Sequence, residues 1–111
     1  MSIYKQQADE VIDFLGTLTE EHPGIADGFN KLYSSSSEEG ELSSKIKELQ
    51  SLGIAIAIRC EGCIAFHTAG ALKAGATQAE IVDTIGVAVC MGGGPSVVYG
   101  KKAYDAMKEF S

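Results

Sequence analysis

The sequence predicts an all-α fold, a compact bundle of five or six helices, and three observations lead to this prediction. The chain of 111 residues is 45% hydrophobic but only 7% aromatic, and it has no tryptophan, which suits closely packed helices built from small side chains. Several segments carry apolar residues at helical spacing. Capping residues, glycines and the two prolines divide the chain into pieces of helix length. We expect a single domain that covers residues 1–111.

The first third of the chain predicts two helices and a loop. Residues 3–18 have an amphipathic pattern, and the sequence HPG at residues 22–24 interrupts it. A short second helix is expected to start near Pro23, because proline is favoured in the first turn of a helix, and to continue through Tyr33. The run SSSSEEGE, residues 34–41, is typical of a polar loop.

The middle of the chain predicts a pair of helices. Ser43 is a suitable N-cap for a helix over residues 45–59. The second half of that segment, GIAIAI, would also suit a buried strand, because alanine and isoleucine are both apolar and alternation cannot be tested. We favour a helix, since the periodic stretch before it continues without a break. The next helix is expected to run from near Cys60 to about Ala74, with Gly75 as its C-terminal stop.

The last third of the chain predicts two more helices. Thr77 and Glu80 form a capping-box pattern in front of an apolar helix over residues 81–91. The glycine run before Pro95 ends that helix, and the final helix spans residues 97–110. The glycine run is not followed by the Lys-Ser/Thr pair of a phosphate-binding loop, so we interpret it as a backbone turn.

Charge and hydropathy exclude several classes of protein. The net charge is −6 and basic clusters are absent from the sequence, which disfavours binding to nucleic acid or to an anionic membrane. The first twenty residues lack the apolar segment of a secretory signal, and no apolar run has the length of a membrane span. Three cysteines, an odd number, argue against an extracellular disulfide framework. We therefore expect a cytoplasmic protein, in which a close cysteine pair is catalytic or metal-binding.

The stretch CEGCIAFH, residues 60–67, carries the chemistry of the chain. Haem attachment requires a histidine directly after the second cysteine, and an isoleucine stands there. Cys60, Cys63 and His67 could supply three zinc ligands, but a structural site needs a fourth, and His22 and Cys90 are both far away in the sequence. We predict neither a metal site nor a bound cofactor.

The cysteine and the histidine outside this motif have simple structural interpretations. Cys90 lies in the apolar sequence VAVCM, and free cysteine is often buried, so we expect Cys90 in the core. His22 precedes a proline and is expected in a loop or at the start of a helix.

The spacing of the motif predicts an activated thiol. Cys60, Cys63 and His67 share one face of a helix, and the looser first turn would allow the two sulfurs to bond. A helix N-terminus stabilises thiolate, and a histidine one turn further can accept the thiol proton. If the two middle helices form a hairpin around Arg59, Glu48 comes within reach of His67. The result would be a Glu-His-Cys relay.

These residues form a pattern that resembles a known family. Glu48 followed by Cys60-x-x-Cys63-x-x-x-His67 resembles the motif of the alkyl hydroperoxidase D-like proteins, which belong to the carboxymuconolactone decarboxylase family. The frame around the motif is similar as well, including the later sequence MGGGP, and the resemblance covers roughly residues 22–110. It implies an all-helical fold, assembly as trimers or hexamers with active sites near subunit contacts, and thiol peroxidase or disulfide reductase chemistry.

The resemblance also implies a role for each residue of the motif. Cys63 would attack the peroxide, and Cys60 would be the resolving thiol. His67 and Glu48 would relay the proton, and a dithiol partner would restore the reduced pair. One departure is Gly62, which stands where alkyl hydroperoxidase D has a second histidine.

Two other functions remain open from the sequence. The chain could be a decarboxylase-like lyase that acts on a small lactone acid, with His67 and Glu48 as acid–base residues, although the decarboxylase branch typically lacks the cysteine pair. It could also be a non-catalytic, redox-sensing oligomer. Self-association is expected in any case, because GIAIAI and GVAVCM carry more apolar surface than a lone chain of this size easily buries.

Overall fold

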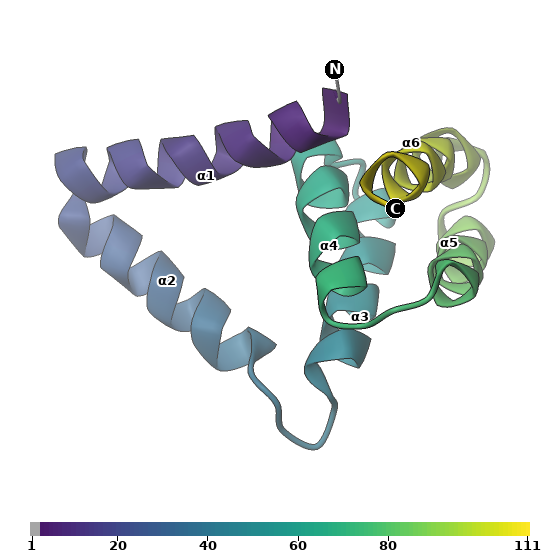
Figure 1. Cartoon of the computed structure of the whole chain (residues 1–111), viewed down its shortest axis with the longest axis horizontal. Coiled ribbons are helices and arrows are strands. Elements are labelled where there is room, and N and C mark those ends of the chain that lie inside the picture. Colours follow the sequence, from purple (N-terminus) through teal and green to yellow (C-terminus); the bar gives the residue numbers. More distant parts are fainter. Residues whose placement is uncertain (1–2) are drawn as a thin grey trace.

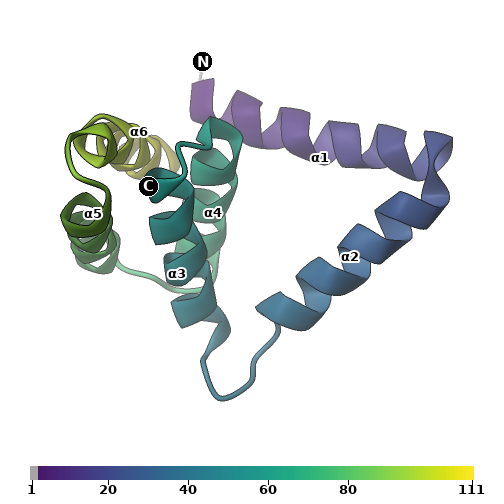
Figure 2. The same ribbon diagram turned by 180° about the vertical axis from the view of Figure 1, so that it is seen from behind.

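The computed structural model describes residues 3–111, which form six α-helices and no strand (Figure 1). The first two helices make an arm that stands out from a group formed by the other four, and in Figures 1 and 2 the arm and the nearest pair of that group outline a triangle. The prediction of an all-α chain with five or six helices is confirmed. The helices are α1 (Ile3–Glu21), α2 (Pro23–Ser37), α3 (Ser44–Ala57), α4 (Glu61–Lys73), α5 (Gln78–Gly92) and α6 (Gly94–Phe110).

The predicted caps are present at the helix starts. The Ser43 hydroxyl accepts a hydrogen bond from the backbone N–H of Ile46 at 3.2 Å. At the start of α5 the Thr77 hydroxyl accepts from the N–H of Glu80 at 3.0 Å, and the Glu80 carboxylate accepts from the N–H of Thr77 at 2.9 Å. Each bond satisfies a backbone donor that has no partner within its helix. GIAIAI belongs to α3, so the helical interpretation of that segment is confirmed.

The second helix is longer than the sequence pattern suggested. His22 lies at the start of α2, one of the two places expected for it, and its Nδ1 caps the helix by accepting the Ile25 N–H at 3.4 Å. The predicted loop at residues 34–41 is wrong in its first half, because α2 continues to Ser37. The N–H of Glu38 still bonds to the carbonyl of Ser34 at 3.1 Å. Serine is nearly neutral in a helix, and a run of it does not end one unless its hydroxyls compete for the backbone.

The remaining turns use residues with positive φ. Gly75 has a φ of 98° after α4, and Gly93 has a φ of 70° between α5 and α6, which confirms the predicted stop and the predicted backbone turn. Arg59 has a φ of 63°, a left-handed conformation that is uncommon for a residue with a side chain. It closes the hairpin between α3 and α4 two residues after α3 ends. The hairpin predicted around this residue is therefore confirmed.

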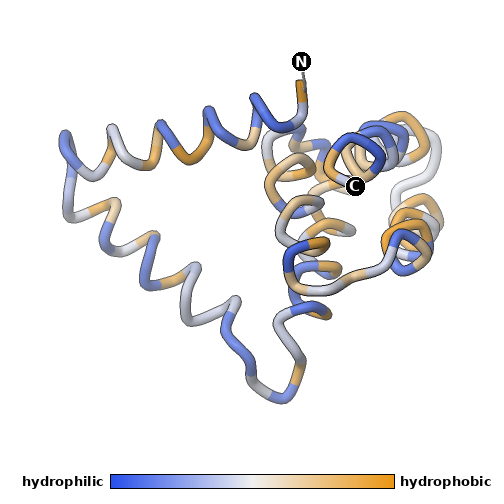
Figure 3. The backbone as a smooth tube through the Cα atoms, viewed as in Figure 1, coloured by the Kyte–Doolittle hydropathy of each residue, from blue (hydrophilic) through white to orange (hydrophobic). Residues whose placement is uncertain are grey.

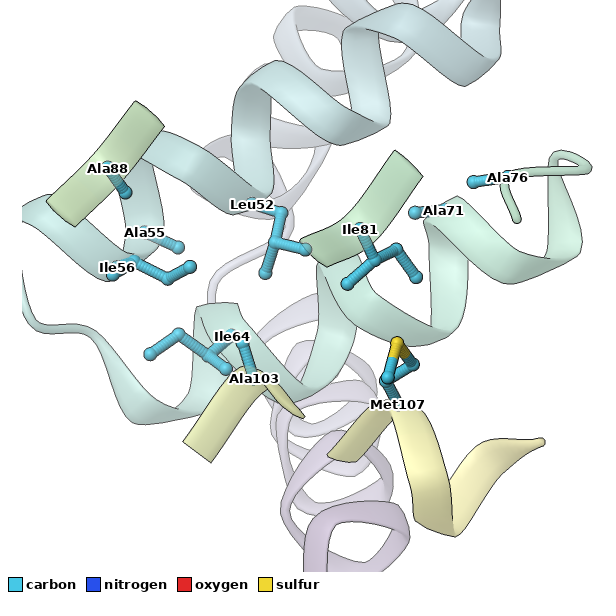
Figure 4. Packing of buried hydrophobic residues seen from close by; sticks show 10 residues of the cluster. All are labelled: Leu52, Ala55, Ile56, Ile64, Ala71, Ala76, Ile81, Ala88, Ala103 and Met107. Atoms are coloured by element: carbon cyan, nitrogen blue, oxygen red, sulfur yellow. The ribbon is translucent and has the colours of Figure 1, made fainter. Parts of the chain in front are cut away.

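The core lies between the last four helices (Figure 4). Small side chains let these helices approach closely. A Cβ atom added to Gly100 of α6 would lie 2.8 Å from Cγ2 of Ile85 in α5. Figure 4 shows isoleucine, leucine and methionine side chains filling the space that the alanines leave. The buried cluster consists of Leu52, Ala55, Ile56, Ile64, Ala71, Ala76, Ile81, Ala88, Ala103 and Met107.

Cys90 does not belong to this core. The expectation that it would be buried is wrong, because Cys90 is exposed. Helix α5 buries Ile81 and Ala88, which are seven residues apart and so lie on one face. A residue two positions after Ala88 points to the opposite side of the helix. Since α5 is apolar on several sides, its sequence alone did not indicate which side packs.

The arm is attached to the bundle near the start of α1. The carboxylate of Glu109 in α6 accepts the backbone N–H groups of Ile3 and Tyr4 at 3.2 and 2.9 Å, and so caps the first turn of α1. Hydrophobic positions recur along both helices of the arm (orange in Figure 3), and several of them are exposed. These exposed side chains include Ile12, Phe14, Ile25, Phe29 and Leu32. Within residues 3–111, no helix is both long enough and apolar enough to span a membrane.

Candidate active site

The cysteine pair lies at the N-terminus of α4. Cys60 is the N-cap residue, with φ −105° and ψ 98°, and Cys63 lies in the first turn of the helix. Because Cys60 stands outside the regular helix, its Cα lies 5.2 Å from that of Cys63, and the two sulfurs form a disulfide. The Sγ of Cys60 also accepts the backbone N–H of Cys63 at 3.3 Å. The expectation that the first turn can bring the two sulfurs together is confirmed.

The electrostatics of this helix end favour a thiolate. Unpaired amides and the helix dipole place partial positive charge where the reduced Cys63 would carry its negative charge. Glu61 lies in the same turn, but its carboxylate pairs with Nζ of Lys102 in α6 at 3.0 Å. The hydrogen bond to Glu61 and the charge of that carboxylate raise the pKa of Lys102, so the lysine stays charged. The carboxylate nearest to the cysteines in the sequence is thus balanced by a cation.

Glu48 and His67 are in direct contact. Oε2 of Glu48 lies 2.9 Å from Nδ1 of His67, and the two side chains are only 14% and 17% exposed. The hairpin of α3 and α4 places them face to face, as the sequence predicted. A carboxylate only accepts hydrogen bonds, so Nδ1 carries a proton and Nε2 is the nitrogen left to exchange one. His67 is one helical turn after Cys63 on the same helix.

A glycine that the sequence reasoning missed makes room for this contact. Gly70 lies one turn after His67 on α4. A Cβ atom at Gly70 would lie 2.5 Å from Oε2 and 2.9 Å from Cδ of Glu48. The Glu48 carboxylate therefore occupies the space that a side chain at Gly70 would fill. No local pattern in the sequence identifies this role, since it depends on how α3 packs against α4.

Tyr33 of α2 is the second residue of the site that the sequence reasoning missed. Its hydroxyl donates a hydrogen bond to Oε1 of Glu48 at 3.3 Å. Its ring lies nearly parallel to the imidazole of His67, with centroids 6.3 Å apart, and it meets Phe66 edge-on at 5.9 Å. In the sequence, Tyr33 contributed only an apolar position to a short helix, and it lies 15 residues before Glu48.

A mostly apolar pocket of about 460 Å³ opens beside the cysteine pair. Its lining comes from α1, from α2, and from Cys60 together with the first part of α4. Gly62 lets α1 come close, because a Cβ there would lie 3.3 Å from Cγ2 of Val11. Among the residues that the structure describes, no lysine, arginine, aspartate or glutamate lines the pocket. The lining consists of Val11, Ile12, Leu15, Phe29, Asn30, Tyr33, Cys60, Gly62, Cys63, Phe66 and His67.

The residues considered as further zinc ligands do not gather at this site. His22 lies at the junction of α1 and α2, and Cys90 lies on α5, which are on opposite sides of the molecule in both views (Figures 1 and 2). In the part of the chain that the structure describes, no group of three or more His, Cys, Asp and Glu side chains is arranged to hold a metal ion.

Comparison with known proteins agrees with this geometry. Residues 23–106, which contain Glu48 and the whole cysteine–histidine motif, match the sequence profile of the Carboxymuconolactone decarboxylase family. The chain belongs to this family. The family resemblance stated from the sequence is thereby confirmed, and the alkyl hydroperoxidase D-like proteins fall within the same family.

Solved structures and curated relatives of the family extend over nearly the whole chain. A carboxymuconolactone decarboxylase family protein from Legionella pneumophila is 37% identical, with a TM-score of 0.93 over 97% of this chain and 96% of that one. A family member from Thermotoga maritima, for which a part in an antioxidative response has been suggested, is 25% identical, with a TM-score of 0.84 over 93% and 88%. An uncharacterized protein from Cupriavidus necator is 29% identical over 93% of this chain and 94% of its own length.

Proposed function

We propose that this member of the carboxymuconolactone decarboxylase family is a thiol peroxidase that reduces hydroperoxides with its Cys60–Cys63 pair and is restored by a dithiol. One observation carries the proposal. A bonded cysteine pair at a helix N-terminus lies one turn before a histidine that is paired with a partly buried carboxylate, and all of these residues except the carboxylate line one pocket. In this proposal Cys63 is the attacking thiol, Cys60 the resolving thiol, and His67 with Glu48 the proton relay.

The proposed reaction balances with one hydroperoxide and one dithiol. In the reduced protein, Nε2 of His67 accepts the proton of the Cys63 thiol. The thiolate attacks the terminal peroxide oxygen, the O–O bond breaks, and the alkoxide leaves as an alcohol with the proton from His67. Cys63 is then a sulfenic acid. The Cys60 thiol attacks its sulfur, releasing water and forming the disulfide. Exchange with a dithiol restores two thiols and leaves the donor as a disulfide.

The pocket supports an uncharged substrate. A small lactone acid carries carboxylates, and burying them without a cation is costly. The pocket offers His67 as its one ionisable nitrogen, and that residue is already paired with Glu48. An organic hydroperoxide with an apolar body needs no such partner and can contact the phenylalanine and aliphatic walls. This contrast favours the peroxidase over the lyase.

We also propose that the chain assembles as a homo-oligomer, a trimer or a hexamer, in the cytoplasm. Large apolar side chains are exposed on the arm, and others are exposed on α5 and α6, including Met91 at 80% and Val87 at 66%. Surfaces of this kind mark protein contacts in many soluble proteins. Light scattering that gave the mass of a single chain would contradict this proposal.

The first experiment is a titration of the reduced protein with hydrogen peroxide and cumene hydroperoxide, followed by intact mass and thiol counting. Because Cys90 is exposed and would react on its own, the titration is done with a Cys90→Ser variant. We expect a fast loss of two protons from the Cys60–Cys63 pair, fully reversed by a dithiol, and a faster reaction with the organic peroxide.

Two matched variants assign the thiols. Cys60→Ser should stop at a sulfenic acid on Cys63, which a trapping reagent reports, whereas Cys63→Ser should lose peroxide reduction. Full turnover by Cys63→Ser would overturn the assignment. Two results together would replace the peroxidase by the lyase function. The thiols of the Cys90→Ser protein would be inert to both peroxides, and the Cys60→Ser/Cys63→Ser protein would still consume a lactone acid.

A further inference from the structure

The Glu48 carboxylate is held at both oxygens. Oε2 bonds to Nδ1 of His67 at 2.9 Å, and Oε1 accepts the Tyr33 hydroxyl at 3.3 Å. Glu48 reaches this place from α3, His67 from α4 and Tyr33 from α2. A glutamate side chain has three rotatable bonds, so one hydrogen bond leaves it several ways to lie. The second bond selects the orientation in which Oε2 faces the imidazole.

The phenol is suited to donate this bond at neutral pH. Burial, and next the negative charge of Glu48, raise the pKa of Tyr33, and these outweigh the opposite effect of a hydrogen bond with Ser37. A phenol that keeps its proton is a steady donor to a carboxylate, and such charge-assisted bonds are stronger than neutral ones. The carboxylate stays an acceptor on both sides.

The ring of Tyr33 acts on His67 directly. Its plane lies 29° from that of the imidazole, and Phe66 meets the imidazole on another side, edge-on at 5.2 Å between centroids. Phe29, one turn earlier on α2, stacks on Tyr33 at 6.3 Å and supports it. The rings of Tyr33 and Phe66 also contact each other, so the imidazole packs against an aromatic pair while its Nδ1 is held by Glu48.

We propose that Tyr33 is a positioning residue of this site. Its hydroxyl fixes the Glu48 carboxylate, and its aromatic ring fixes the His67 imidazole. The inference rests on the proposed function, in that it concerns the proton relay to Cys63. It adds a requirement that the sequence motif does not contain, because α2 lies outside the hairpin of α3 and α4 that carries the motif (Figures 1 and 2). The relay is complete only when α2 is in place.

The test uses a protein in which Cys63 is the sole thiol. The chain has three cysteines, so Cys60→Ser/Cys90→Ser leaves one, and serine at residue 60 can still cap α4. Alkylation by iodoacetamide, an uncharged reagent, is followed as a function of pH. Tyr33→Phe keeps the ring and removes the hydroxyl. We expect its rate at pH 7 to fall about 3- to 10-fold, with the pH midpoint moved upward. This is less than the full effect of losing a hydrogen bond to a charged group, because Tyr33 acts on the thiol only through Glu48 and His67.

A double-mutant cycle separates positioning from a general effect on the fold. Glu48→Gln should lower the rate at least as much as Tyr33→Phe, and adding Tyr33→Phe to Glu48→Gln should change the rate less than about 2-fold. Tyr104→Phe is the matched control, because it removes a hydroxyl from a tyrosine of α6 that is 43% exposed. It should leave the profile unchanged. Thermal unfolding by circular dichroism verifies that each variant is folded.

Three outcomes would overturn the proposal. The first is a Tyr33→Phe profile equal to that of the parent at every pH. The second is that Tyr33→Phe lowers the alkylation rate by the same factor in the Glu48→Gln protein as in the parent, since Tyr33 would then act independently of the carboxylate. The third is a parent Cys63 with the pH midpoint of an ordinary thiol. The alkylation readout separates this proposal from the proposed function. If the parent had an activated Cys63 but reduced no peroxide, the proposed function would be refuted. The double-mutant cycle would still decide the role of Tyr33.

Discussion

Replacing Gly70 by alanine should disconnect the relay while leaving the helix intact. The added Cβ would lie 2.5 Å from Oε2 of Glu48, and real Cβ atoms do not come within 3.0 Å of another heavy atom. The carboxylate must therefore move away from α4 by roughly 0.5 Å or more. His67 is on α4 as well, so the same movement lengthens its 2.9 Å bond to Glu48 to about 3.4 Å, where the hydrogen bond is much weaker.

The free energies involved set the size of the effect. Alanine in place of glycine stabilises a helix by about 1 kcal/mol, and overpacking a well-filled site costs about 1–3 kcal/mol. Because the crowded atoms belong to the end of a flexible side chain, we expect the free energy of unfolding to fall by no more than about 2 kcal/mol. An intact hydrogen bond to a charged partner contributes about 1.5–3 kcal/mol, so losing roughly half of that energy should lower the alkylation rate of Cys63 at pH 7 about tenfold.

The assay is the pH profile of Cys63 alkylation together with urea unfolding. Gly86→Ala is the matched control, because Gly86 also lies within a helix and a Cβ there would meet nothing within 4 Å. It should raise the free energy of unfolding by about 0.5–1 kcal/mol and leave the profile unchanged. If Gly70→Ala kept the parent profile, the carboxylate would not depend on the space at Gly70, and the reasoning would be refuted.

Three further predictions concern stability and are measured by urea unfolding. Ser43→Ala should cost about 1 kcal/mol by removing the cap of α3, and an unchanged midpoint would contradict the role of that hydroxyl. Gly100→Ala should cost about 1–3 kcal/mol, because its Cβ would press on Ile85 at 2.8 Å; a stabilised variant would mean that α5 and α6 can separate freely. The hydrogen bond from the Thr77 N–H and, to a smaller extent, the hydrogen bond from Lys45 lower the pKa of Glu80 below its ordinary value of 4.5. The stability from the Glu80 carboxylate is therefore present above that value and lost as the pH falls through the lowered pKa. Glu80→Gln should be less stable than the parent at pH 7, and the difference should shrink as the pH is lowered below 4.5; a difference that stayed the same down to the lowest pH at which the parent folds would show that charge is not involved.

Local signals in the sequence predicted most of the fold and the centre of the site. Caps such as Ser43 and Thr77 act within one turn of themselves, so their residue types are sufficient evidence. The pairing of Glu48 with His67 also followed from a short hairpin, because two helices joined by a tight turn have a fixed register. The sequence did not indicate where α2 ends, since serine favours neither helix nor loop strongly.

What the sequence could not supply depends on packing between distant segments. Tyr33 reaches Glu48 because α2 packs against α3, and no periodicity in the sequence encodes how two helices joined by a loop pack. Gly70 matters only because a carboxylate from α3 lies against it. Cys90 was assigned to the wrong side of a helix with apolar residues on several faces, where the choice is made by the neighbouring helices.

The elements that line the pocket would, in the proposed function, separate reactivity from selectivity along the chain. The sulfurs and the proposed acid–base pair belong to residues 48–67, whereas six of the other lining residues belong to α1 and α2. In the proposed function, the pocket-lining positions of α1 and α2 could therefore be diversified, provided that Tyr33 and the Phe29 ring that supports it are kept. A library confined to Val11, Ile12 and Leu15 would change which molecules reach the sulfur and would leave in place the groups proposed to activate it.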